Sequence, residues 1–205
     1  MVKFMTASSV FKFTWDQVAA GLWQRYPNPN SKHVLTEDVL SRRIEGQKLI
    51  SLRILTKTNK IPKWGERFVG HNKNILIIEE SVVDPKEKTF TTYTRNVGLQ
   101  KVMNVEEKCV YKVSSENPSW TLCEKSAWVS SPLFGVGGAI EMFGIKRFRN
   151  NAVKAAQGFD FVLTRLFRAD HLKLHPLLTS NMIMDTTRKA AEIAKSKTTM
   201  LSRAT

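Results

Sequence analysis

The segment around two prolines contains the first residues that could do chemistry. It reads Trp-Gln-Arg-Tyr-Pro-Asn-Pro-Asn-Ser-Lys-His from Trp23 to His33. Proline has no backbone N–H and holds the residue before it in an extended conformation, so Pro27 must end any helix that precedes it. An arginine fixed at such a break, here Arg25, can present its guanidinium group to a phosphate. The alternative is an ordinary helix end with Arg25 in solvent.

A second set of polar side chains lies on one side of a predicted long helix. Arg147, Asn151 and Lys154 follow one another at spacings of four and three residues, which makes them neighbours on a helix surface. A phosphate taken into a protein needs cationic partners, whereas a lone lysine is usually a solvated surface charge. His33, which follows the prolines, and Lys57, which ends a predicted strand, are further candidates.

No pattern in the sequence favours catalysis or a metal site. His171 and His175 have a spacing that suits zinc on a helix, but Pro176 follows directly. A Gly-x-Ser-x-Gly motif is absent. The neighbours Glu106 and Glu107 would point to opposite faces of a strand and cannot act as a carboxylate pair. We therefore predict a protein that is not an enzyme, with no catalytic residue, metal or cofactor.

The charge of the chain favours an anionic partner. Its 205 residues include 32 Lys and Arg against 18 Asp and Glu, a net charge of +14. Such an excess suits nucleic acid, an acidic protein or an anionic membrane surface. The longest aliphatic run, Ile75 to Ile78, is far too short to span a bilayer. We expect a soluble protein that meets membranes only at their surface.

Hydrophobic periodicity predicts the elements that must position these residues. Thr14 and Gln17 form a capping box that starts a short helix over 15–24. A long helix is predicted over 133–167, with a late start or a bend because glycines cluster near Gly137. Seven strands are predicted at 2–12, 34–43, 49–57, 75–83, 90–97, 102–113 and 120–129. Their short connections favour an antiparallel meander.

The predicted fold class is therefore α+β, with a seven-stranded antiparallel sheet and one long C-terminal helix. The sheet could pack flat, or it could curl around the helix and leave a cavity. Cys109 and Cys123 fall on adjacent predicted strands, where buried free thiols are favoured over a disulfide. We place the domain at 1–170 and predict a basic tail over 171–205, either weakly amphipathic or disordered.

An apolar segment interrupts the predicted strands after residue 58. It contains Ile61, Pro62, Trp64 and Phe68, and it is too short for a stable helix and too apolar for an ordinary loop. Its aromatic residues could be buried anchors. Alternatively, the segment could form a flap that covers a pocket and touches a membrane.

Four segments of the chain resemble the PRELI-like family, the phospholipid-transfer proteins of the mitochondrial intermembrane space. They are Arg25-Tyr-Pro-Asn-Pro, Lys32-His-Val-Leu, Thr56-Lys-Thr-Asn-Lys-Ile-Pro-Lys-Trp and Tyr93-Thr-Arg-Asn, and the resemblance runs collinearly from Met1 to about Leu166. It implies an apolar pocket that shields one phospholipid as cargo. The branch resembled most carries phosphatidic acid between the outer and inner membranes and so supports cardiolipin synthesis.

The same resemblance implies roles for individual residues and partners. The positions that contact the headgroup map onto Arg25, His33, Lys57, Arg147, Asn151 and Lys154. The lid maps onto about Ile61 to Phe68, including Pro62 and Trp64. Family members also depend on a small helical-hairpin protein with twin Cys-x9-Cys motifs, which forms a heterodimer with them, and they touch anionic membranes transiently.

Two other functions remain open on the sequence alone. A pI of about 10.0 and five Trp would suit a nucleic-acid-binding protein, and the net charge would suit a basic adaptor for an acidic partner. No helix-turn-helix, zinc-finger or RNA-binding aromatic signature is present, and the basic residues are spread along the chain. We therefore predict no nucleic-acid partner.

Overall fold

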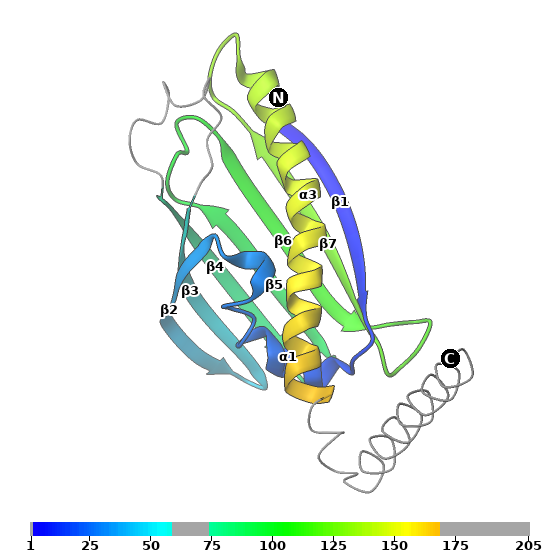
Figure 1. Cartoon of the computed structure of the whole chain (residues 1–205). Coiled ribbons are helices and arrows are strands. Elements are labelled where there is room, and N and C mark those ends of the chain that lie inside the picture. Colours follow the sequence, from blue (N-terminus) through cyan, green and yellow to red (C-terminus); the bar gives the residue numbers. More distant parts are fainter. Residues whose placement is uncertain (1, 59–73, 169–205) are drawn as a thin grey trace, which may run out of the picture. The chain divides into compact units, whose positions relative to one another are not determined.

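A computed structural model describes residues 2–58 and 74–168 of the chain (Figure 1). The predicted lid, the predicted tail and the pair His171 and His175 lie outside the described residues. The compact unit is Met1–Leu163, and the chain from Thr164 onward forms a second unit, described only over Thr164–Arg168. The predicted boundary at residue 170 is therefore still a prediction. Among the described helices, none is both long and apolar enough to cross a bilayer.

Seven antiparallel strands form one sheet, as predicted. The strands are β1 (Val2–Phe11), β2 (Val34–Glu45), β3 (Lys48–Thr58), β4 (Asn74–Asp84), β5 (Thr89–Asn96), β6 (Asn104–Val113) and β7 (Thr121–Ser130). They lie in the order β1-β7-β6-β5-β4-β3-β2. The meander therefore holds from β2 to β7, but β1 pairs with β7 instead of β2. The reason is that a helix and the proline segment separate β1 from β2 in the chain.

The predicted capping box starts helix α1 (Trp15–Leu22). The Thr14 side chain accepts a hydrogen bond from the Gln17 backbone, and the Gln17 side chain accepts one from the Thr14 backbone. The proline segment then makes a 3-10 turn, η1 (Pro29–Ser31). The long helix α3 (Gly137–Leu163) begins four residues later than its predicted range of 133–167. Gly135, which has a positive φ of 78°, precedes it, so the expected late start is confirmed.

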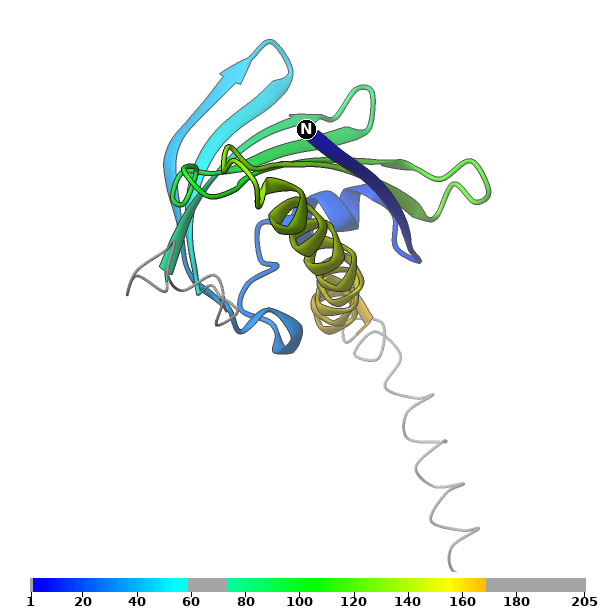
Figure 2. The ribbon, with the colours of Figure 1, turned by 90° about the horizontal axis from the view of Figure 1, so that it is seen from above.

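The sheet curls, and α3 lies on its concave side (Figure 2). Two register shifts in the β2–β3 pairing, between Val34 and Thr36 and between Val39 and Ser41, bend the edge of the sheet. Aromatic rings fill the part of the concave face next to α1. Phe11 contacts Phe159 of α3 at 5.2 Å between ring centroids, and Phe90 contacts Tyr111 at 6.1 Å. The first contact holds the helix against the sheet, and the second joins β5 to β6.

Two glycines let α3 approach its neighbours closely. A Cβ on Gly144 would lie 2.7 Å from Val129 Cγ1 of β7, and a Cβ on Gly158 would lie 2.9 Å from Asn28 Cγ in the proline segment. Asn28 cannot easily move away. Its Nδ2 donates to the Arg25 carbonyl at 2.7 Å and its Oδ1 accepts from the Asn30 backbone at 3.1 Å. Gly158 is therefore the point at which the proline segment docks on the helix.

This docking predicts that Gly158→Ala destabilises the domain by about 1–3 kcal/mol through overpacking. The matched control is Gly138→Ala in the same helix, where nothing lies within 4 Å of the added Cβ. The control should be neutral or stabilising by up to about 1 kcal/mol, since alanine has the higher helix propensity. Urea unfolding of both variants measures the difference. Equal stability of the two variants would contradict close packing at Gly158.

Candidate functional site

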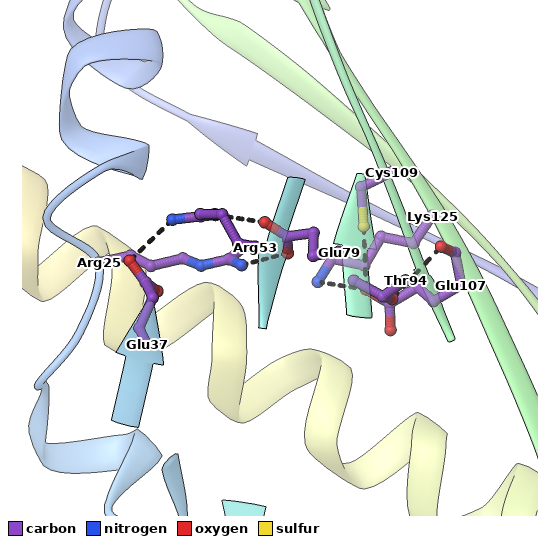
Figure 3. Close-up of polar contacts among 8 residues, drawn as sticks. All are labelled: Arg25, Glu37, Arg53, Glu79, Thr94, Glu107, Cys109 and Lys125. Atoms are coloured by element: carbon purple, nitrogen blue, oxygen red, sulfur yellow. Dashed lines mark hydrogen bonds and ion pairs between the residues drawn. The ribbon is translucent and has the colours of Figure 1, made fainter. Parts of the chain in front are cut away.

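A buried carboxylate on β4 joins three parts of the chain. Glu79 accepts hydrogen bonds from Arg25, just before the prolines, and from Arg53 on β3 (Figure 3). Arg53 Nη1 also donates to Glu37 Oε1 on β2 at 2.7 Å. Both Arg53 and Glu79 are only 1% exposed. The network therefore ties the proline segment to the middle of the concave face.

Strand register extends this network into a row of polar residues across the sheet. Arg53 pairs with Glu79, Glu79 with Thr94, and Thr94 with Glu107. Lys125 Nζ of β7 lies 3.8 Å from Glu107 Oε1. We call these five residues the polar row. With Arg25 and Glu37 the row contains three basic and three acidic side chains, so it is close to neutral as a whole.

Both cysteines lie next to the polar row. Cys109 and Cys123 are free and buried, as the sequence predicted. Cys109 Sγ donates a hydrogen bond to Glu107 Oε1 at 2.9 Å. The thiols thus occupy the space between the row and the aromatic part of the core.

The two arginines change the acidity of Glu79. Burial alone would raise the pKa of this carboxyl, but Arg25 and Arg53 outweigh burial and lower it from 4.5 to about 2. Burial likewise acts against the charged form of Arg25, and the Glu79 carboxylate overcomes it and raises the pKa of Arg25. Both partners are therefore charged at neutral pH.

A second group of charges surrounds His33. Burial lowers the pKa of its imidazole below 6.5, and the positive charges of Lys57, Arg147 and Lys154 lower it further. Three cationic side chains therefore act on one imidazole, which is neutral at pH 7. We call these four residues the cationic cluster. Burial also lowers the pKa of Arg147.

Backbone pairing and helix periodicity bring the cationic cluster together. The His33 carbonyl accepts a hydrogen bond from the Thr58 backbone at 2.8 Å, and Val34 pairs with Lys57. On α3, Lys154 precedes Gly158 by one helical turn. The helix side on which the proline segment docks is therefore also the side that carries Arg147 and Lys154.

The structure thus brings four of the six predicted headgroup residues together. Asn151 lies between Arg147 and Lys154 on the same helix and is exposed. Arg25 belongs to the Glu79 network instead, with its guanidinium engaged by the carboxylate. Its Nε is buried and has no hydrogen-bond partner within the described part of the chain. Headgroup contact by these six residues is still a prediction.

Sequence reasoning missed Arg53 and Glu79. A signal was present, because Ser51, Arg53 and Leu55 alternate on one face of β3 and all three are buried. A charged residue at a buried strand position requires a charged partner on a neighbouring strand. The sequence alone did not show which acidic residue would be opposite Arg53.

Comparison with known proteins assigns the chain to a family. The sequence profile described as the PRELI-like family matches residues 16–169. The chain belongs to the PRELI-like family. This is a family of mitochondrial lipid-transfer proteins, so membership favours lipid transfer over the basic adaptor and the nucleic-acid-binding protein.

Relatives in animals and fungi cover most of the PRELI-like chain. "PRELI domain-containing protein 1, mitochondrial" of Gallus gallus is 47% identical over 198 residues, which cover 95% of this chain and 88% of the relative. "Protein UPS1, mitochondrial" of Saccharomyces cerevisiae is 32% identical over 170 residues, covering 82% and 97% of the two chains. The names of these relatives agree with the predicted mitochondrial location.

Solved structures with the same fold have little sequence in common with this chain. The Zhui aromatase/cyclase from Streptomyces sp. R1128 has a TM-score of 0.57 at 9% identity and covers 82% of this chain and 98% of its own. At that identity the likeness shows the fold alone.

The lowered pKa of Glu79 makes the free energy of unfolding depend on pH in the acidic range. The unfolded carboxyl titrates near 4.5 and the folded one near 2, so its contribution is complete above pH 4.5 and disappears as the pH falls toward 2. One pKa unit corresponds to about 1.4 kcal/mol, so the loss should be about 3 kcal/mol. Glu79→Gln should remove this part of the pH dependence, whereas Glu80→Gln, at a neighbouring exposed site, should keep it. Urea unfolding between pH 2.5 and 6 measures both, and identical profiles would contradict the ion pairs.

The cationic cluster predicts a change in the titration of His33. Lys154→Gln removes one nearby positive charge and should raise the pKa of His33. Lys146→Gln makes the same charge change at an exposed position of the same helix and should leave the pKa almost unchanged. NMR titration of the histidine ring signals tests this. Coincident curves for the two variants would mean that Lys154 does not act on His33.

Proposed function

We propose that this protein transfers phosphatidic acid between the outer and inner mitochondrial membranes and thereby supports cardiolipin synthesis. The observation that carries the proposal is the cationic cluster, in which Lys57, Arg147 and Lys154 all act on His33. A phosphate monoester carries between one and two negative charges near neutral pH, and several cationic groups are needed to compensate it away from water. The polar row cannot supply this charge, because its own acids balance its bases.

The location of the cluster supports carriage of a whole lipid. It lies where the proline segment, β3 and α3 meet on the concave side of the sheet. Each methylene of an acyl chain that leaves water contributes about 0.8 kcal/mol, so a curled sheet that covers the chains can extract a lipid whose headgroup is neutralised at the cluster. The negative charge of a bound phosphate would raise the pKa of His33.

The remaining features of the proposal follow from the family. We infer that the protein works in the intermembrane space, peripheral to both membranes, without catalysis, metal or cofactor. Its partner would be a small helical-hairpin protein with twin Cys-x9-Cys motifs. Residues Ile61 to Phe68 would form the lid over the bound lipid, and Asn151 and Arg25 would complete the headgroup contacts.

The proposal predicts the effect of removing charge from the cluster. Arg147→Gln combined with Lys154→Gln should lower the rate of phosphatidic acid transfer between vesicles more than tenfold, since each charge-assisted hydrogen bond contributes roughly 1.5–3 kcal/mol. The double variant of Lys146→Gln and Arg149→Gln loses the same charge from exposed positions of α3 and should transfer nearly normally. A fluorescent phosphatidic acid dequenching assay measures the rates. Equal transfer rates in the two double variants would mean that the cluster contributes only to the overall charge of the protein and does not bind the phosphate.

A further inference from the structure

The loop between β7 and α3 presents a fully exposed aromatic residue. Phe134 is 103% exposed, more than any other large apolar residue in the described part of the chain. Its neighbour Val136 is 42% exposed. An isolated exposed apolar residue is common, but several at one end of a molecule indicate an interaction surface.

Hydrogen bonds hold this loop in place. Ser131 Oγ donates to the Val102 carbonyl at 2.6 Å and accepts from the Leu133 backbone at 3.3 Å. The buried carboxylate of Glu141, in the first turns of α3, accepts from the Ser131 backbone at 3.3 Å. The loop is thus tied to the β5–β6 connection on one side and to the helix on the other, and Phe134 is presented from a fixed base.

The β5–β6 connection extends the apolar surface. Val97 and Leu76 are each 43% exposed, and the Val97 backbone donates to the Leu76 carbonyl at 2.9 Å. We call Leu76, Val97, Phe134 and Val136 the apical patch. The β7–α3 and β5–β6 connections lie at the end of the sheet opposite α1 (Figure 1).

The two connections that carry Val97 and Phe134 contain almost no charge. No charged residue occurs between Lys125 and Glu141, and the only one from 96 to 105 is the exposed Lys101. Leu76 adjoins Ile75, which pairs with Lys57 of the cationic cluster. The patch is therefore apolar at its tip and basic at its border, the composition that binds an anionic lipid surface.

We propose that the apical patch inserts into an anionic bilayer with Phe134 as its anchor. A protein partner would need a matching pocket to bury the exposed side chain of Phe134. A bilayer interface buries an apolar side chain without such a pocket, so it suits an aromatic residue on a fixed loop. Insertion in this orientation turns the end of β3 with Lys57 toward the membrane, so a headgroup could pass directly from the bilayer to the cationic cluster. The inference rests on the proposed function, since it supplies the docking step of lipid transfer.

An environment-sensitive probe at the loop tip tests insertion directly. Full-length Phe134→Cys is labelled with the fluorophore NBD and mixed with phosphatidylcholine vesicles that contain or lack phosphatidic acid. The matched control is Ile44→Cys, because Ile44 is also an exposed apolar residue, at 76%, but lies by the β2–β3 turn. The native cysteines are 3% and 0% exposed, and labelling of the unsubstituted protein measures their background.

We expect the probe at 134, but not at 44, to brighten and shift to the blue on phosphatidate-containing vesicles, and to be quenched by doxyl-labelled lipid. Phe134→Ser should lower vesicle binding in flotation roughly tenfold, in line with the transfer free energy of a large apolar side chain, whereas Ile44→Ser should not. An unchanged probe at 134 in protein that floats with vesicles would overturn the inference, even if lipid transfer is normal. Insertion at 134 in a protein that transfers no lipid would support it and refute the proposed function instead.

Discussion

The architecture depends on keeping the carboxylate of Glu79 charged inside the protein. Removing a carboxylate from water costs several kcal/mol unless it is paired and hydrogen-bonded. Arg53 meets this need only if β3 and β4 keep their register, and Arg25 meets it only if the chain turns toward the sheet as it leaves α1. One buried charge therefore constrains the pairing of two strands and the course of the proline segment.

The path of the proline segment then determines where the functional charges meet. Beyond Arg25, Asn28 docks against Gly158 of α3, and the chain enters β2 directly after His33, beside the end of β3. The acidic and basic side chains of the polar row compensate one another and serve the fold. The cationic cluster contains three basic side chains and no acidic one. The Glu79 network and the cationic cluster are thus two separate groups of charges.

Much of this organisation could be predicted from the sequence, and the exceptions have physical causes. Alternating strands, the capping box at Thr14 and the late start of α3 depend on local patterns, which the sequence shows directly. The pairing of β1 with β7 depends on the path of α1 and the proline segment between β1 and β2. Local sequence patterns do not show that path. The Arg53–Glu79 pair was missed for the same reason, because strand register decides which charges face one another. Arg25 was predicted to bind phosphate, and the sequence could not reveal that its Nη2 donates a hydrogen bond to the buried Glu79.

The central claim is that the concave side of this protein holds one anionic phospholipid by its phosphate. Native mass spectrometry of the full-length chain, expressed in cells and purified without detergent, tests it most directly. The account predicts a population with the mass of the chain plus one phospholipid, identified as phosphatidic acid by fragmentation, and its loss when Arg147 and Lys154 are both replaced by Gln. Protein that carries no lipid after incubation with phosphatidic acid vesicles, or that retains lipid equally well without the two cations, would contradict the account.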